Sequence, residues 1–284
     1  MILFMYYILY NPLSNGGTCV NKAKELEIKF NKENKENKLI SLIEINNIQE
    51  FLNSVNNDDT IIIVGGDGTL YHIANEIHGY DISNKIVLLA KAGTGNDFYR
   101  DVKRYEKDGF VRIEKYLSNT PSVEFNGIIN YFNNSCGIGV DGDICNRVNA
   151  AKKKSGIHYL IHCLKAVLSF EKFTLKTKID DEEKIFEKTW FTTVMQGRYF
   201  GGGMKVAPSQ DRNSDTLTMV VVHKVPVALL MIILPTIYLG KHTIFKKYVK
   251  IFNCKNVELE TSAPQFIEID GDIVPEVCKL KIKK

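Results

Sequence analysis

Residues 60–69 read TIIIVGGDGT, a run of β-branched residues that passes directly into a glycine-rich turn. Such a continuous run is typical of a strand that is buried on both faces of a parallel sheet. The next residues, 70–77, are predicted to form a helix. The turn is therefore expected at the carboxyl end of a strand, the edge at which open parallel sheets bind their ligands.

The composition of this turn indicates a phosphate site. Glycines let the backbone approach a phosphate closely, and the following helix directs N–H groups and the positive end of its dipole at the anion. A carboxylate in the middle of the turn, Asp67, would repel a phosphate unless a cation lay between them. The turn therefore predicts phosphate together with Mg²⁺. The alternative is a plain glycine turn in which Asp67 caps the helix that follows.

Two other turns follow predicted strands in the same way. GTGNDF at 93–98 follows a predicted strand at 85–90, and NPLSNGG at 11–17 follows one at 2–10. Because parallel strands present their carboxyl ends at one edge of a sheet, the three turns are expected to converge. The predicted nucleotide-binding residues are Asn11, Ser14, Gly65, Gly66, Asp67, Gly68, Thr69, Gly93, Thr94, Gly95 and Asn96.

Each of these two turns also has a simpler explanation. Asn96 or Asp97 could cap the next helix, and residues 11–17 could form an ordinary turn. In the functional interpretation, Asp97 instead adds a second carboxylate to the site.

Elements along the chain divide it into two domains. Residues 1–121 alternate strands and helices, which predicts an α/β domain with a parallel sheet that carries the GGDGT turn. Residues 122–284 are rich in strands and are predicted to form a β-rich, sandwich-like domain. Asn126-Gly127 is a strong hairpin signal in this half. Its other predicted strands lie at 173–179, 189–195, 216–222, 257–260, 266–269 and 277–282, and its predicted helices at 144–170 and 227–248.

Composition excludes several functional classes. The net charge of +4 suits an enzyme that handles phosphates or visits an anionic membrane, and it is far from that of a dedicated nucleic-acid binder. Six cysteines without any CxxC pair indicate reduced thiols in a cytoplasmic protein. The apolar run at 225–239 is interrupted by two prolines and is shorter than the roughly 20 residues of a spanning helix.

These motifs resemble the catalytic domain of the diacylglycerol kinase and sphingosine kinase superfamily, in particular its soluble bacterial lipid-kinase branch. The resemblance extends over essentially the whole chain. Besides the three turns, it rests on GIGVD at 137–141, GGGMKVAP at 201–208 and IDGD at 269–272.

The resemblance implies an ATP- and Mg²⁺-dependent lipid kinase, with the conversion of diacylglycerol to phosphatidic acid as the expected reaction. It implies that residues 1–121 bind ATP and that residues 122–284 bind the lipid and contribute to catalysis. Asp270 would be the general base that accepts the proton of the lipid hydroxyl. Further acidic residues of an Asp–water–Mg²⁺ network would be Asp67, Asp97, Glu124 and Asp272. A structural Mg²⁺ would be bound by the carbonyl oxygens of Arg212 and Leu217 and the side chain of Asp215.

Three departures from the family pattern stand out. Glu124 and Asp272 occupy positions that usually hold Asp and Glu, so the reach of each carboxylate changes while its charge does not. Thr216 replaces the glycine after the metal-site Asp215. The chain also ends soon after Asp272, where relatives usually continue.

The partners follow from the same resemblance and from composition. The expected substrate is a lipid alcohol such as diacylglycerol, and the expected location is the cytoplasm, peripheral to the inner face of the membrane. The apolar run at 225–239 is followed by basic residues and could rest on an anionic membrane, or it could be a core helix followed by a solvated one. No nucleic-acid partner is expected, and a homodimer is possible.

Two other functions compete with this interpretation. An NAD kinase also contains GGDGT but would be expected to continue with Asn-x-Gly-x-x-Gly-Phe, where this chain has GTGNDF. A non-catalytic lipid or nucleotide binder would be expected to have lost the carboxylates, yet Asp67, Asp97 and Asp270 are all present.

Overall fold

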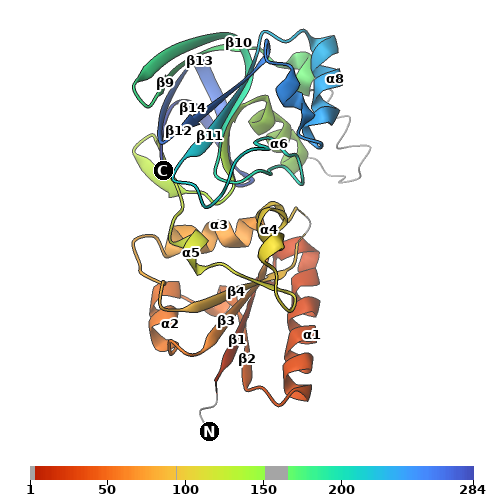
Figure 1. Ribbon diagram of the computed structural model, residues 1–284, viewed down its shortest axis with the longest axis vertical. Coiled ribbons are helices and arrows are strands. Elements are labelled where there is room, and N and C mark those ends of the chain that lie inside the picture. Colours follow the sequence, from red (N-terminus) through yellow and green to blue (C-terminus); the bar gives the residue numbers. More distant parts are fainter. Residues whose placement is uncertain (1–3, 94, 151–165) are drawn as a thin grey trace. The chain divides into compact units, whose positions relative to one another are not determined.

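The computed structural model describes residues 4–93, 95–150 and 166–284. The chain divides into two compact units, Met1–Thr120 and Pro121–Lys284 (Figure 1). The first unit is a five-stranded sheet flanked by helices, and the second is dominated by antiparallel strands. The predicted fold class, an α/β domain followed by a β-rich domain, is therefore confirmed.

The N-terminal sheet has the strand order β2-β1-β3-β4-β5. Four strands are parallel, and the edge strand β5 runs antiparallel to β4. The strands are β1 (Tyr6–Tyr10), β2 (Asn37–Ser41), β3 (Thr60–Gly65), β4 (Ile86–Lys91) and β5 (Phe110–Arg112). The helices are α1 (Thr18–Lys32), α2 (Ile48–Ser54), α3 (Asp67–Glu76), α4 (Asp97–Val102) and α5 (Glu114–Leu117), with 3-10 turns η1 (Ser14–Gly17), η2 (Leu42–Glu44) and η3 (Lys103–Tyr105).

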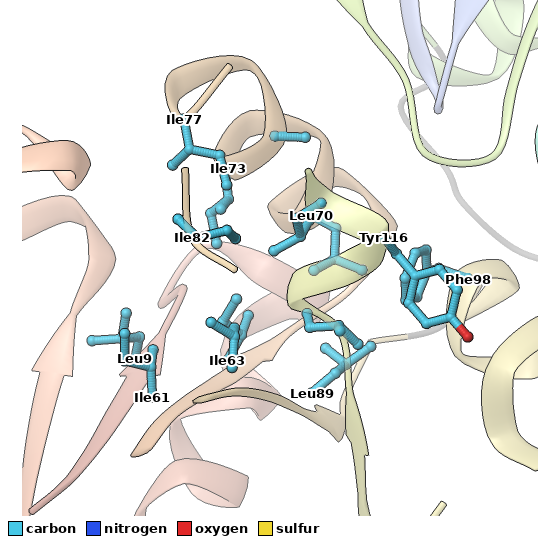
Figure 2. Packing of buried hydrophobic residues seen from close by; sticks show 14 of the residues in the cluster. Leu9, Ile61, Ile63, Leu70, Ile73, Ile77, Ile82, Leu89, Phe98 and Tyr116 are labelled. Atoms are coloured by element: carbon cyan, nitrogen blue, oxygen red, sulfur yellow. The ribbon is translucent and has the colours of Figure 1, made fainter. Parts of the chain in front are cut away.

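Every residue of the central strand β3 is buried, because helices cover both faces of the sheet. Successive side chains of a strand point to opposite faces. Ile62 accordingly packs in a cluster with residues of α1, while Ile61 and Ile63 belong to the larger cluster with α2 and α3. Figure 2 shows this larger cluster. Burial of one such side chain contributes about 1.5–3 kcal/mol, so this strand fixes the position of the turn that follows it.

The C-terminal unit contains a nine-stranded sheet with the order β12-β11-β10-β8-β13-β14-β6-β7. Strand β9 pairs with both β10 and β13, so β8, β10, β9 and β13 form a closed ring of strands. The strands are β6 (Ser122–Phe125), β7 (Ile128–Tyr131), β8 (Ser135–Gly139), β9 (Phe173–Ile179), β10 (Glu182–Met195), β11 (Leu217–His223), β12 (Val249–Cys254), β13 (Asn256–Ile269) and β14 (Asp272–Lys283).

Helical segments of this unit are α6 (Val140–Ala150), α8 (Val227–Ile237) and the 3-10 turn η4 (Lys241–Ile244). The predicted helix at 227–248 is too long, because α8 ends at Ile237 and the chain reaches strand β12 at Val249. The predicted helix at 144–170 begins earlier, at Val140, and residues 151–165 lie outside the described part of the chain. Within the described residues, no helix combines the length and hydropathy needed to cross a bilayer.

Candidate active site

Asp67 connects two of the three predicted turns of the N-terminal unit. Its Oδ2 accepts a hydrogen bond from the backbone N–H of Asp97 at 3.0 Å, and its Oδ1 accepts one from Phe98 at 2.8 Å. These donors open α4, so the carboxylate caps a helix 30 residues further along the chain. In these two bonds Asp67 therefore caps α4 and not its own helix, α3. A carboxylate offers about four acceptor positions, so capping is compatible with coordination of a metal.

Thr69, in the first turn of α3, connects the remaining turn to this group. Its Oγ1 accepts a hydrogen bond from Asn11 Nδ2 at 3.3 Å and lies 3.0 Å from Ser14 Oγ. The three turns predicted to converge at the carboxyl edge of the sheet are therefore in contact. They can present backbone N–H groups and hydroxyls together to one anionic ligand.

The close approach of the turns explains two of the glycines. Gly93 has a φ of +94°, and a Cβ there would lie 3.0 Å from the Cα of Gly66. A Cβ on Gly95 would lie 3.0 Å from Asp67 Oδ2. A larger residue at either position would push the two turns apart, because real Cβ contacts are rarely this short.

Two polar side chains of the second turn have intramolecular partners. Asn96 adopts the left-handed conformation and donates a hydrogen bond from Nδ2 to the carbonyl of Gly93 at 2.6 Å. It lies at the N-cap of α4, but its side chain makes no capping bond. Asp97 is buried and pairs with Arg100 at 2.9 Å. Thr94 lies outside the described residues.

The N-terminal site fits Mg²⁺ only together with a phosphate ligand. Among the described residues, no group of three or more His, Cys, Asp or Glu side chains converges to hold a metal. Mg²⁺ at phosphate sites is usually held by one or two carboxylates together with phosphate oxygens and water. Asp67 suits that arrangement.

Asp270 lies in the turn between β13 and β14 with a φ of 48°. Its carboxylate accepts three backbone hydrogen bonds, from Asn133 at 2.5 Å, Asn134 at 2.8 Å and Ser135 at 3.0 Å. These donors hold the carboxylate in one orientation. The N–H of Gly271 instead donates to Glu268 Oε1 at 2.5 Å. In these bonds the Asp270 carboxylate therefore holds residues 133–135, and Glu268 accepts from Gly271.

Two other predicted acids lie apart from each other in the C-terminal unit. Asp272 is exposed at the start of β14, opposite Ile269. Glu124, on β6, is paired with Lys281, nine residues further along β14. For an extended strand that separation is roughly 30 Å. Glu124 is therefore not part of the surroundings of Asp270 and Asp272 within this unit.

Two buried acids, Glu268 and Asp141, lie near Asp270 and were not among the predicted site residues. Glu268 is 3% exposed, and its pKa is raised well above its usual value by burial and then by the charges of Asp141 and Asp270. Burial also raises the pKa of Asp141 to about 7, although the N–H groups of Asp141 and Gly142 act in the opposite direction. The GIGVD motif already pointed to Asp141. No sequence motif singles out Glu268, which lies between two isoleucines in an ordinary strand pattern.

An apolar cavity of about 370 Å³ lies in the same unit. Residues of α6, β10 and α8, together with Phe200–Met204, line it; they include Ile144, Phe191, Met204, Met231 and Leu234. Its size falls within the usual range for small-ligand sites.

The three predicted ligands of the structural metal have other partners. Asp215 is exposed and pairs with Lys255 Nζ at 2.6 Å. The carbonyl of Arg212 accepts a hydrogen bond from Gln196 Nε2 at 3.3 Å, and that of Leu217 accepts one from Cys254 Sγ at 3.7 Å. A Mg²⁺ ion bound here would have to displace the Lys255 ammonium, and this site stays a prediction.

Arg212 has a second role that sequence did not indicate. Its guanidinium is buried and donates hydrogen bonds to the carbonyl of Asn133 and, at 2.7 Å, to the side-chain oxygen of Asn134. The backbone N–H groups of these two residues hold the carboxylate of Asp270. Arg212 therefore helps to position Asp270.

We expect added Mg²⁺ to raise the melting temperature of the protein if the Asp215 site binds metal, because a ligand of the folded state stabilises it by mass action. Asp215→Asn should remove that response, whereas Lys255→Met, which removes the competing ammonium, should enlarge it. Differential scanning calorimetry with Mg²⁺ and with chelator tests this expectation. A melting temperature that is indifferent to chelation and to Asp215→Asn would show that the site binds no metal.

Comparisons with known proteins match both halves of the chain. The family model described as diacylglycerol kinase catalytic domain matches residues 5–121. The model described as YegS C-terminal NAD kinase beta sandwich-like domain matches residues 134–281, more than half of the chain.

Individual relatives agree with these matches. YtlR of Bacillus subtilis, whose name places it among lipid kinases, is 27% identical over 81% of this chain and 78% of its own length. A diacylglycerol kinase of Mycobacterium tuberculosis is 23% identical over 93% of this chain and 87% of its own. A solved structure described as a diacylglycerol kinase from Bacillus anthracis shares the fold, with a TM-score of 0.62, 19% identity, and coverage of 100% of this chain and 95% of that one.

A parallel α/β unit with converging glycine-rich turns, followed by an antiparallel β unit, defines a two-domain protein of the lipid kinase class. The chain belongs to the family that joins a diacylglycerol kinase catalytic domain to a YegS-type C-terminal domain.

Proposed function

We propose that the protein is an ATP- and Mg²⁺-dependent lipid kinase that transfers the γ-phosphoryl group of ATP to a lipid hydroxyl, with diacylglycerol as the acceptor and phosphatidic acid as the product. The observation that carries this proposal is the contact between the GGDGT and GTGNDF turns through Asp67. A carboxylate fixed between two glycine-rich turns at the edge of a sheet suits a Mg²⁺–phosphate ligand better than a bare anion.

The N-terminal unit would hold the nucleotide phosphates. Helix α3 begins directly after β3, so its first N–H groups have no partner within the helix and point at the turn. Asn11 and Ser14 would contact the nucleotide from the first turn, where Thr69 holds them. Mg²⁺, when bound, would neutralise charge on the transferred group, and the family comparison supports ATP as its donor.

The C-terminal unit would supply the base. The lipid hydroxyl oxygen forms a bond to the γ-phosphorus while the bond from that phosphorus to the bridging oxygen of ADP breaks. The hydroxyl proton passes to the carboxylate of Asp270. Because phosphoryl transfer has a loose transition state, Asp270 would chiefly orient the hydroxyl and receive its proton late. Three backbone N–H groups hold the carboxylate ready for that task.

A membrane-facing surface would deliver the lipid from the inner face of the cytoplasmic membrane. Apolar side chains are exposed on α8 and just beyond it, at Ile232, Leu239 and Ile244. Exposed lysines accompany them at Lys241, Lys246 and Lys247. Apolar side chains beside basic ones suit insertion into an anionic bilayer surface. The alternative is a core helix followed by a solvated segment that makes no contact with a membrane.

Leu239→Ser combined with Ile244→Ser is expected to weaken binding to phosphatidylglycerol-containing vesicles by about tenfold or more, because each exposed side chain would bury apolar area in the bilayer. Co-sedimentation with vesicles measures the effect. Ile185→Ser is the matched control, since Ile185 is equally exposed but lies on β10. Equal binding by the double variant and the control would contradict the membrane surface.

Incubation of the protein with ATP, Mg²⁺ and a panel of lipid alcohols in micelles tests the proposed function and its acceptor. We expect phosphorylated diacylglycerol to form faster than phosphorylated monoacylglycerol, undecaprenol or sphingosine. Phosphorylation of NAD in a parallel reaction, with no lipid product, would instead identify an NAD kinase. ATP left unspent with every lipid would indicate a non-catalytic binder.

A further inference from the structure

Glu268 is a buried acid that the proposed mechanism does not use. It lies on β13 and is 3% exposed. Its neighbours Ile267 and Ile269 are completely buried, so both faces of the strand are covered at this point. Burial of a carboxyl group opposes folding unless its oxygen atoms find hydrogen-bond partners. Both oxygens of Glu268 have such a partner, and both partners belong to the surroundings of Asp270.

The first partner is the hairpin turn that carries Asp270. Asp270 and Gly271 are the two residues between β13 and β14, with φ values of 48° and 100°. Glu268 Oε1 accepts a hydrogen bond from the N–H of Gly271 at 2.5 Å. Because residues other than glycine seldom adopt a positive φ, this bond helps to hold Asp270 in a backbone conformation that is otherwise disfavoured.

The second partner is Ser135, which connects the two acids. Its hydroxyl oxygen lies 3.4 Å from Glu268 Oε2, and its N–H donates to Asp270 Oδ1 at 3.0 Å. The carbonyl of Ser135 also accepts a hydrogen bond from the N–H of Asp270 at 3.1 Å. Ser135 is completely buried at the start of β8. The orientation of the Asp270 carboxylate is therefore coupled to the position of Glu268.

We propose that Glu268 is a positioning residue for phosphoryl transfer: through Gly271 and Ser135 it holds the Asp270 carboxylate in the orientation that receives the proton of the lipid hydroxyl. The inference rests on the proposed function, in which Asp270 is the base. Glu268 contacts neither ATP nor lipid in this role, so its whole effect on turnover passes through Asp270.

Glu268 acts in this role as a neutral acid. Burial, and then the charges of Asp141 and Asp270, raise the pKa of Glu268 well above its usual value. A second negative charge beside Asp270 would be repelled by it, whereas a protonated carboxyl group still offers Oε1 as an acceptor for Gly271. Glutamine is neutral, has nearly the same shape and carries the same acceptor. It should therefore replace Glu268 without loss of function.

Kinetics of variants test the coupling of Glu268 to Asp270. Glu268→Leu is expected to lower kcat by about tenfold, the usual effect of losing one such hydrogen bond, with KM for ATP and for the lipid nearly unchanged. Glu268→Gln should keep the wild-type kcat within about twofold. Combined with Asp270→Asn, Glu268→Leu should cause no further loss, because residues that act as one unit are not additive. Glu258→Leu is the matched control, since Glu258 is an exposed acid on the same strand.

Amide hydrogen exchange, followed by NMR in heavy water, tests the same coupling without any turnover. The N–H groups of Asn133 and Asn134 donate to the Asp270 carboxylate, so their exchange reports how firmly it is held. In Glu268→Leu they should exchange at least about tenfold faster than in the wild type, and in Glu268→Gln at the wild-type rate. The N–H groups of Val220 and Val221, on the buried strand β11, should be unaffected in both variants.

Wild-type kcat in Glu268→Leu, wild-type exchange at Asn133 and Asn134 in that variant, or equal impairment of Glu268→Gln and Glu268→Leu would each overturn the inference. A further tenfold loss on top of Asp270→Asn would do the same, because Glu268 would then act independently of Asp270. Faster exchange at Val220 and Val221 as well would show a role in overall stability alone.

Failure of the inference can be told apart from failure of the proposed function. If the wild type phosphorylates no lipid, the proposed function is refuted, and the exchange rates still decide whether Glu268 holds the Asp270 carboxylate. If the wild type is active and Glu268→Leu matches it in turnover and exchange, the inference is refuted and the proposed function stands.

Discussion

Asp67→Ala is expected to lower kcat/KM for phosphoryl transfer by about 10²-fold or more, as the loss of a group that stabilises charge in the transition state does. Asp67 is fixed between two glycine-rich turns by hydrogen bonds to the N–H groups of Asp97 and Phe98. Its removal takes away the carboxylate proposed to face Mg²⁺. It also removes the cap of α4, which costs about 0.5–2 kcal/mol of stability. The protein should therefore remain folded with a slightly lower melting temperature.

Asp67→Asn separates these two effects. Asparagine retains one side-chain oxygen that can cap α4, but it lacks the negative charge that suits a metal. We expect it to recover most of the melting temperature and little of the activity. Steady-state kinetics and calorimetry on the same preparations measure both quantities. If Asp67→Ala keeps more than about a tenth of the wild-type kcat/KM, equivalent to about 1.4 kcal/mol, the phosphate-site assignment is wrong.

Asp270→Asn is expected to lower kcat by about 10²-fold or more, within the usual range for loss of a general base, with ATP affinity nearly unchanged. The structure adds a second consequence. In the wild type, the backbone N–H groups of Asn133, Asn134 and Ser135 donate to the carboxylate oxygens of Asp270. An asparagine at position 270 would place an NH₂ group, itself a donor, opposite some of these N–H groups. Leaving buried donors without acceptors is unfavourable, so the variant should also lose stability.

The turnover of Asp270→Asn must therefore be measured per folded molecule, together with its melting temperature and its ATP affinity. Glu276→Gln is a suitable control. Glu276 is an exposed acid on strand β14 of the same hairpin, whereas residues 133–135 donate their hydrogen bonds to Asp270. Normal turnover by folded Asp270→Asn would end the assignment of Asp270 as the base, and the observed hydrogen bonds would then be purely structural.

Local patterns predicted much of the fold. The run at 60–64 became the fully buried strand β3, and Asn126-Gly127 became the turn between β6 and β7, with positive φ at both residues. Strand β8 escaped notice because its sequence, SCGIG, contains two glycines and no alternation. Strand β12 was not predicted, and the helix predicted up to residue 248 ends directly before it.

The part of the candidate site that could be predicted is the meeting of turns at the carboxyl ends of parallel strands. Parallel topology alone implied that the three turns would meet, and their contacts through Thr69 and Asp67 agree with that expectation. What could not be predicted depends on packing between segments far apart in sequence. Capping of α4 by Asp67 and the anchoring of Asp270 by residues 133–135 are of this kind. So is the burial of Asp141, which no local pattern indicates.

Transfer of the labelled γ-phosphate of ATP to diacylglycerol is the measurement that tests the central claim most directly. Wild-type protein with Mg²⁺ and diacylglycerol in mixed micelles should produce labelled phosphatidic acid and ADP in equal amounts. Chelation of Mg²⁺ should abolish both products, and the Asp67→Ala substitution should slow the formation of both by about 10²-fold or more. ADP formed without any labelled lipid, or labelled lipid formed equally well by Asp67→Ala, would contradict the account.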